Sequence, residues 1–136
     1  MIMRTALLLL LSTIALADPA ADMLNVFSAT AEALTNDDPA AFLDKFDRNM
    51  PGYAALRTDI EGLLAAYEVG STIEVVTQAG DEEKETVELD WLLITTEKNA
   101  SNSSQDTRRR VVKCSLERRG KQWKITALEP LDFFKY

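Results

Sequence analysis

Residues 85–96 read Glu-Thr-Val-Glu-Leu-Asp-Trp-Leu-Leu-Ile-Thr-Thr, and they decide the fold. Polar and apolar side chains alternate along this stretch up to Trp91, which is the pattern of a β-strand with one buried face. Three more strand-like runs occur at residues 72–78, 107–118 and 122–129. Short polar connections separate the four runs, at residues 80–83, 99–106 and 119–120. Strands joined by such short connections predict an antiparallel β-meander.

The predicted register follows from a turn at Arg119-Gly120. This turn places Leu116, Cys114, Val112 and Arg110 opposite Trp123, Ile125, Ala127 and Glu129, and one placement of the preceding loop sets Trp91, Leu89 and Val87 opposite Val112, Cys114 and Leu116. One face of the sheet is then apolar across three strands. Because a slip of one residue would exchange the two faces, this agreement identifies the side that faces the core.

The residues before Gly70 have helical rather than strand spacing. Asp18-Pro19 and Asp38-Pro39 are typical helix starts, and apolar residues recur three and four positions apart after each of them. The second stripe includes Phe42, Leu43, Phe46 and Met50, and a third runs from Tyr53 to Tyr67. Helices followed by a meander predict an α+β fold, with the N-terminal helices packed on a curved antiparallel sheet.

Three segments carry a resemblance to a known family: Phe42-Leu43, the strand 86–91, and the ending 123–130 with Phe133-Phe134. With them the chain resembles the nuclear transport factor 2-like (NTF2-like) superfamily, and in particular its SnoaL-like and ketosteroid-isomerase-like bacterial members, over nearly all of residues 19–134. The resemblance implies a cystatin-like cone that encloses a cavity. It implies no single activity, because the superfamily includes isomerases, dehydratases, transport factors and binding modules.

Residues 1–17 have the organisation of a cleaved signal peptide. Arg4 supplies the positive charge, an apolar run extends to Ile14, and Ala15-Leu16-Ala17 forms the cleavage pattern. The run is too short to cross a membrane, which takes about 20 apolar residues. We therefore expect residues 18–136 to be a single exported domain, periplasmic or extracellular, with no stable membrane insertion after cleavage.

Composition argues against several classes of function. The chain has a net charge of −7, which disfavours nucleic acid as a partner, and it has no His, the commonest metal ligand and general base. The lone Cys114 lies in an apolar alternation and is expected to be buried. No phosphate loop or metal-binding cluster is present in the sequence, so we expect neither a cofactor nor a metal.

Five residues are candidates for ligand binding. The aromatic side chains of Tyr53, Trp91 and Trp123 could line an apolar pocket, and Arg110 and Glu129 could orient a ligand at its mouth. Each candidate also has a plainer interpretation, because aromatic residues at this spacing commonly form core and paired charges commonly form structural ion pairs.

Three hypotheses for function follow. The leading one is a non-catalytic exported domain that binds a small apolar molecule or a protein partner, and the absence of His motivates it. The second is a cofactor-free isomerase, dehydratase or hydrolase that uses Glu129, Asp59 or Tyr53 for acid–base chemistry. No catalytic position of the related enzymes can be matched to one residue here. The third is a homodimer formed through the outer sheet face, where Leu92 and Ile94 would supply an apolar patch.

Export makes a prediction for the mature protein. Protein isolated from its native cell envelope should have the intact mass of residues 18–136, as measured by mass spectrometry without prior proteolysis. An intact mass that still includes residues 1–17 would contradict the signal peptide.

Overall fold

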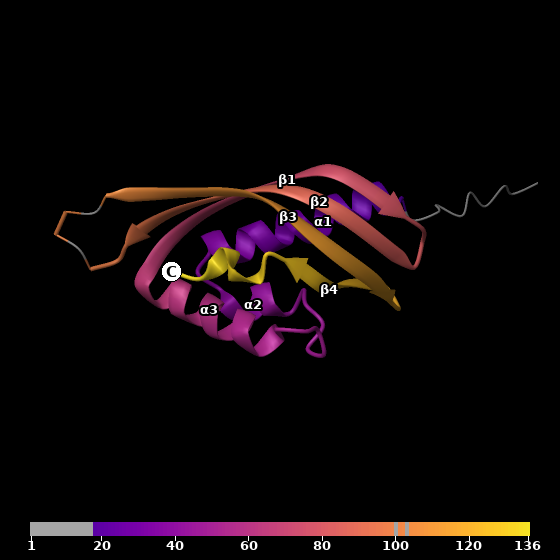
Figure 1. Ribbon diagram of the computed structural model, residues 1–136, viewed down its shortest axis with the longest axis horizontal. Coiled ribbons are helices and arrows are strands. Elements are labelled where there is room, and N and C mark those ends of the chain that lie inside the picture. The colour runs from indigo at the N-terminus through magenta and orange to yellow at the C-terminus, as the bar shows by residue number, and fades with distance from the viewer. Residues whose placement is uncertain (1–17, 100, 103) are drawn as a thin grey trace, which may run out of the picture.

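The computed structural model describes residues 18–99, 101–102 and 104–136. The predicted signal peptide lies outside these residues. Within them the chain forms, in order, α1 (Pro19–Thr35), α2 (Pro39–Leu43), α3 (Tyr53–Ala66), β1 (Tyr67–Gly80), β2 (Lys84–Glu97), β3 (Gln105–Arg119), β4 (Gln122–Glu129) and the short 3₁₀ helix η1 (Leu131–Phe134) (Figure 1). None of the helices in this part of the chain combines the length and apolar character needed to span a bilayer.

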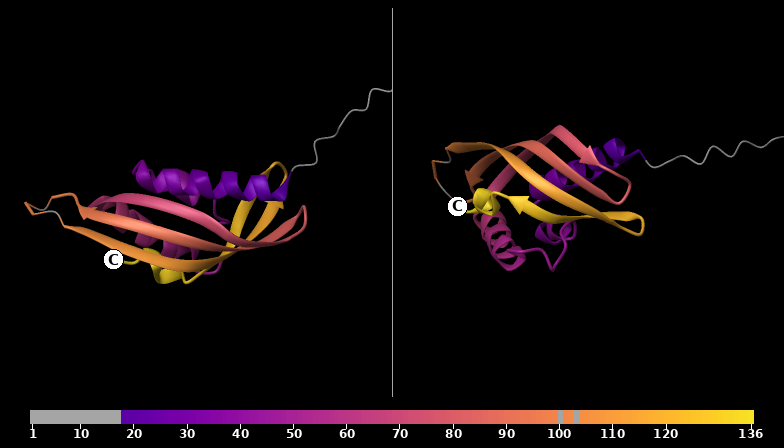
Figure 2. Two further views of the ribbon diagram at one scale, coloured as in Figure 1. Left: turned by 90° about the horizontal axis from the view of Figure 1, so that it is seen from above. Right: turned by 45° about the vertical axis from the view of Figure 1, so that its right-hand side comes forward.

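The sheet has the order β1-β2-β3-β4 and is antiparallel throughout. It arches over the helices and η1, as Figure 1 shows from one side and Figure 2 from two others. The alternating residues of β2 explain this arrangement, because Val87, Leu89, Trp91 and Leu93 are all buried beneath the arch. The predicted α+β class, with helices against a curved meander, is confirmed.

Both aspartates predicted to start helices act as N-caps. The Asp18 carboxylate accepts a hydrogen bond from the Ala20 amide at 3.0 Å, and the Asp38 carboxylate accepts one from the Ala41 amide at 3.0 Å. Each cap is followed by a proline, which has no amide hydrogen to leave unpaired in the first turn. The local sequence therefore determines where both helices begin.

The second helix is shorter than its apolar stripe predicts. It ends at Leu43, and Phe46 lies instead on an extended segment beside β4. There the Ile125 amide donates to the Lys45 carbonyl at 2.8 Å, and the Asp47 amide donates to the Ile125 carbonyl at 2.9 Å. Backbone groups of residues 45–47 thus form hydrogen bonds with the edge of β4 instead of continuing the helix.

The predicted register is wrong by two residues in both hairpins tested. Trp91 lies opposite Arg110 rather than Val112, and Leu116 lies opposite Ile125 rather than Trp123. The turn before β4 is one residue further along, with Gly120 at φ +65° as its first loop residue, a place that favours glycine. A bulge between Ser115 and Leu116 adds a further shift. A shift of two preserves the faces, so the predicted buried side is correct for β2, β3 and the start of β4. Beyond the bulge the shift is odd, and Leu128 is buried in place of the predicted Ala127.

The centre of the cone is filled with aromatic rings. The Trp91 ring lies 5.0 Å from Phe134 and 5.8 Å from Phe133, measured between centroids, and 6.4 Å from Phe42. The Trp91 indole nitrogen donates to the Ser71 hydroxyl at 2.9 Å, which satisfies its polar group within the core. Side chains from η1 thus occupy the space in which the resemblance implies a cavity.

The aromatic centre predicts a large effect of removing one ring. Replacing Phe134, which is fully buried, by Ala should lower the free energy of unfolding by about 3–5 kcal/mol, because a cavity is left beside Trp91. Leu24, which is 59% exposed, serves as the control, and Leu24→Ala should change stability by less than about 0.5 kcal/mol. Urea denaturation followed by tryptophan fluorescence measures both values. Equal stabilities of the two variants would contradict a core centred on these rings.

Candidate functional site

The five predicted ligand-binding residues do not meet at one site. Trp91 lies in the core, and Trp123 packs at the start of β4, where its indole nitrogen donates to Asp22 at 3.2 Å. Arg110 and Glu129 are both exposed, but they are not opposite each other as predicted, because Glu129 pairs with Lys113. The register shift and the bulge separate them. Of the five, only Tyr53 lines the open groove between α2 and α3. A binding role for any of the five stays a prediction.

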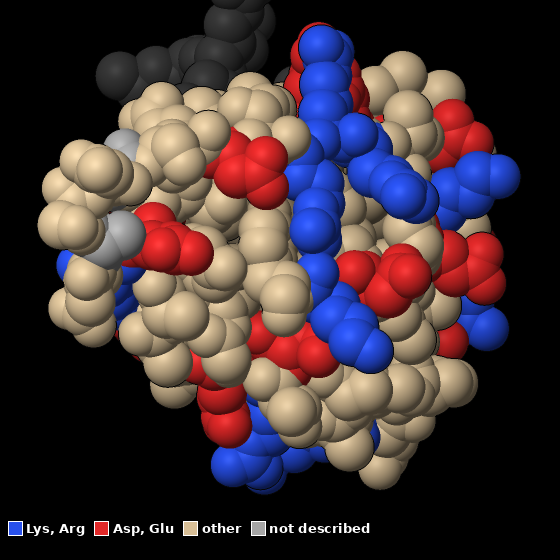
Figure 3. Space-filling view, turned by 60° about the vertical axis from the view of Figure 1, so that its left-hand side comes forward, with Lys and Arg blue, Asp and Glu red and all other residues tan. Residues whose placement is uncertain are grey.

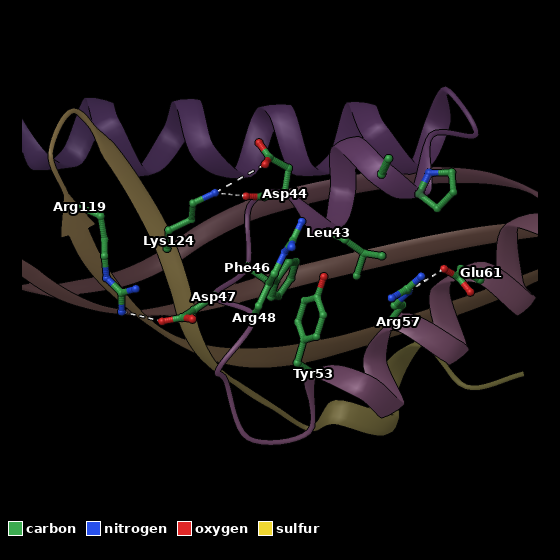
Figure 4. Close-up of a pocket in the computed structure, with 12 residues that line it drawn as sticks. Leu43, Asp44, Phe46, Asp47, Arg48, Tyr53, Arg57, Glu61, Arg119 and Lys124 are labelled. Atoms are coloured by element: carbon green, nitrogen blue, oxygen red, sulfur yellow. Dashed lines mark hydrogen bonds and ion pairs between the residues drawn. The ribbon is translucent and has the colours of Figure 1, made fainter.

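An open groove lies between α2, the loop that follows it and α3 (Figure 4). We call it the α2–α3 groove. It has a volume of about 650 Å³, within the range of small-molecule sites. Residues from both helices, the loop and β4 line it, among them Leu43, Phe46, Arg48, Tyr53, Arg57 and Lys124.

The floor of the groove is apolar and firmly held. Phe46 is 2% exposed, its ring packs 5.0 Å from Phe42, and its backbone lies against Ile125 of β4. Leu43 is buried beside it at the end of α2. The floor is therefore an extension of the hydrophobic core that reaches the surface between the two helices.

Ion pairs surround this floor. Asp47 pairs with Arg119 at 2.5 Å, and Arg57 pairs with Glu61 at 2.9 Å along α3. Lys124 donates to the carbonyl of Asp44 and lies 3.7 Å from the Asp44 carboxylate. Three of the four cationic side chains that line the groove are thus each paired with a carboxylate.

Asp47 is the most constrained of these carboxylates. Its side chain accepts a hydrogen bond from the Asn49 amide at 2.8 Å in addition to the Arg119 contact. The Asn49 hydrogen bond, together with Arg119, lowers the pKa of Asp47 from its usual value. These bonds fix the backbone of the loop that carries Arg48.

Arg48 and Tyr53 are the two polar groups of the groove that remain available. Neither the Arg48 guanidinium nor the Tyr53 hydroxyl forms a hydrogen bond or ion pair with another described residue. In Figure 4 both side chains point from the loop and from the start of α3 towards α2, whose residue Leu43 also lines the groove. Sequence reasoning singled out Tyr53 but missed Arg48, because its position depends on the pairing of the loop with β4.

Two buried ionisable groups lie outside the groove. Glu85 is 4% exposed, and its Oε2 atom has no hydrogen-bond partner among the described residues. Its place in the alternation, two residues before Val87, is a signal that could have identified it as inward-facing. Cys114 is buried, as predicted, and burial raises the pKa of its thiol to about 12. This thiol stays protonated and unreactive in the folded protein.

The outer face of the sheet carries charges of both signs. Arg109 pairs with Asp90 at 2.5 Å, and Lys113 lies 3.8 Å from Glu88, both across β2 and β3. Figure 3 shows a band of basic side chains with acidic side chains beside it. In the part of the chain that the structure describes, no three His, Cys, Asp or Glu side chains are grouped so that they could hold a metal ion.

The lowered pKa of Asp47 makes a prediction about stability and pH. Because the folded-state pKa lies below the unfolded value of about 3.9, the stabilisation is present above pH 4 and is lost as pH falls through the folded pKa. Asp47→Asn should therefore destabilise the protein at pH 6 and have a smaller effect at pH 3, measured by urea denaturation. Asp59→Asn on α3, which removes a carboxylate that has no ion pair among the described residues, is the control. A deficit for Asp47→Asn that does not change with pH would contradict this assignment.

Comparison with known proteins identifies the fold. No family model matches the sequence, and no curated protein matches it significantly. Among solved structures, a proposed scytalone dehydratase from Novosphingobium aromaticivorans has a TM-score of 0.72 and 12% identity, over 81% of this chain and 80% of that one. A hexachlorocyclohexane dehydrochlorinase of type 2 has a TM-score of 0.64 and 14% identity, over 81% and 82%.

A third structure carries the name of the fold. A proposed dehydratase of the NTF2-like family from Streptomyces avermitilis has a TM-score of 0.62 and 10% identity, over 80% of this chain and 92% of that one. Identities this low show a shared fold and leave activity open. With its helices beneath a curved four-stranded sheet, this chain has the fold of the nuclear transport factor 2-like superfamily that its sequence resembles.

Proposed function

We propose that this protein is an exported, non-catalytic domain that binds a small molecule in the α2–α3 groove. The observation that carries the proposal is the contrast between two spaces. Trp91, Phe133 and Phe134 fill the centre of the cone, whereas the groove is open and combines a buried apolar floor with free polar groups. The groove is bordered by charged side chains, and a concave site that offers an apolar surface together with polar groups to orient a ligand is typical of ligand binding.

The hydrogen bonding of Thr30 and the exposure of Glu129 also support binding over catalysis. Thr30, Thr95 and Glu85 are the buried polar residues of the described chain. The Thr30 hydroxyl donates to the Val26 carbonyl at 2.7 Å, which satisfies it within α1. Glu129, one of the proposed acid–base residues, is exposed at the end of β4, where solvent would leave it poorly suited to proton transfer in a closed site.

One observation favours the enzymatic alternative. Glu85 is a buried carboxylate with an unpartnered oxygen, and two of the similar folds carry names of elimination enzymes, a dehydratase and a dehydrochlorinase. A cofactor-free reaction in this chain would use Glu85 as its base rather than Glu129 or Asp59. The two hypotheses differ in location, because Glu85 lies at the start of β2 and does not line the α2–α3 groove.

The dimer hypothesis has weaker support. Leu92 and Ile94 lie on the outer face and are only half-buried, but the neighbouring charges of β2 and β3 already pair within the chain. Covering these exposed pairs with a second copy would require their desolvation.

A substitution that fills the groove tests the proposal. Ala40 is exposed and lines the groove, so Ala40→Trp should block it without disturbing the core. Native mass spectrometry of protein from the native envelope should show a retained small molecule on the wild type and at least a tenfold lower occupancy on the variant. Ala54→Trp, at an exposed position of α3 outside the groove, should retain the molecule. A wild-type protein that carries no molecule, or equal occupancy in both variants, would overturn binding in this groove.

A further inference from the structure

We infer that the ligand of the α2–α3 groove is an organic monoanion that carries a ring, with its carboxylate held by Arg48 and Tyr53 and its ring lying on the apolar floor. This inference rests on the proposed function and specifies the chemistry of the molecule bound there.

The charge balance of the groove leaves one cation unmatched. Arg57, Arg119 and Lys124 are paired with Glu61, Asp47 and Asp44 respectively. Arg48 has no such partner among the residues that the structure describes, so one positive charge remains. This local excess occurs in a chain whose net charge is −7, and it is suited to one negative charge on a ligand.

The two groups that would hold the anion have fixed backbones. Arg48 lies in a turn that two hydrogen bonds close. The Asn49 amide donates to the Asp47 carboxylate at 2.8 Å, and the Met50 amide donates to the Asp47 carbonyl at 3.0 Å. Tyr53 begins α3 directly after Gly52, whose φ is +80° and whose missing side chain leaves room for Leu131. The anchored turn and helix start reduce the ordering that a ligand must impose.

The chemistry of the two tips favours a carboxylate. A guanidinium donates two parallel hydrogen bonds to a planar carboxylate, and a phenolic hydroxyl can donate a third. Figure 4 shows both tips directed to the same side of the groove, towards α2. An anion in front of α2 would accept from both residues at once.

The rest of the groove selects the body and the charge of the ligand. The half-buried ring of Tyr53, with the small exposed parts of Leu43 and Phe46 beside it, offers an apolar surface, and a flat ring covers such a surface with little loss of internal freedom. A second negative charge would lie near the carboxylates of Asp44 and Glu61, which also line the groove. Their repulsion disfavours a dianion.

The test uses 2-naphthoate as the probe and isothermal titration calorimetry on the protein from its native envelope, cleared of any retained molecule. Arg48→Gln should weaken binding about 10- to 100-fold, as expected for loss of a charge-assisted hydrogen bond. Tyr53→Phe should weaken it about 3- to 10-fold. Arg109→Gln, which removes an arginine on the outer face of the sheet, should leave the affinity within twofold. The neutral 2-naphthamide and the dianionic 2,6-naphthalenedicarboxylate should each bind at least tenfold more weakly than 2-naphthoate.

The outcomes separate the two proposals. If Ala40→Trp blocks the probe but the amide binds as tightly as 2-naphthoate, or Arg48→Gln binds it unchanged, the anion assignment is wrong and the groove remains the site. If Ala40→Trp binds 2-naphthoate as well as the wild type does, the groove itself is wrong. A wild-type protein with no measurable affinity for 2-naphthoate overturns the inference.

Discussion

The packing of Trp91 against Phe133 and Phe134 is the constraint on which the rest of the structure depends. These rings connect the middle of the sheet to η1 at the other end of the sequence, and all three are buried. Because they occupy the centre of the cone, the groove that we propose as the ligand site lies outside the core, between α2 and α3. The sequence resemblance implies an enclosed cavity, whereas we propose a site on the surface of the same fold, and this architecture by itself determines little about function.

The loop after α2 links that core to the candidate site. Residues 45–47 pair with β4 and so cover one edge of the sheet, which would otherwise expose unpaired backbone groups. The same pairing buries Phe46 as the floor of the groove and lets Asp47 reach Arg119. Edge protection and site construction are therefore achieved by one short segment, and the position of Arg48 follows from both.

The sequence was sufficient for the faces of β2 and β3 but not for the register of the sheet or for the end of β4, where Leu128 rather than Ala127 is buried. Alternation through Val87, Leu89 and Trp91 identified the buried side, since only one phase of the pattern is apolar. A shift of two residues leaves that pattern unchanged, so apolar patterning could not distinguish the true pairing from the predicted one. Between β3 and β4 the choice is made by Gly120 in the turn and by the bulge at Ser115, whose effects are geometric. Arg48 was missed for a related reason, because pairing with a distant strand determines where its loop lies.

The position of η1 in the sequence also bears on the order in which the protein can fold. Trp91 belongs to β2, but two of the rings that cover it come from residues 131–134, after the last strand. A growing chain that lacks those residues leaves a tryptophan and part of the sheet in contact with water. Local helices can form early, since their caps lie within the first turn, but closure of the hydrophobic centre has to wait for the segment beyond β4. Completion of the fold thus depends on Phe133 and Phe134, which follow the last strand of the sheet.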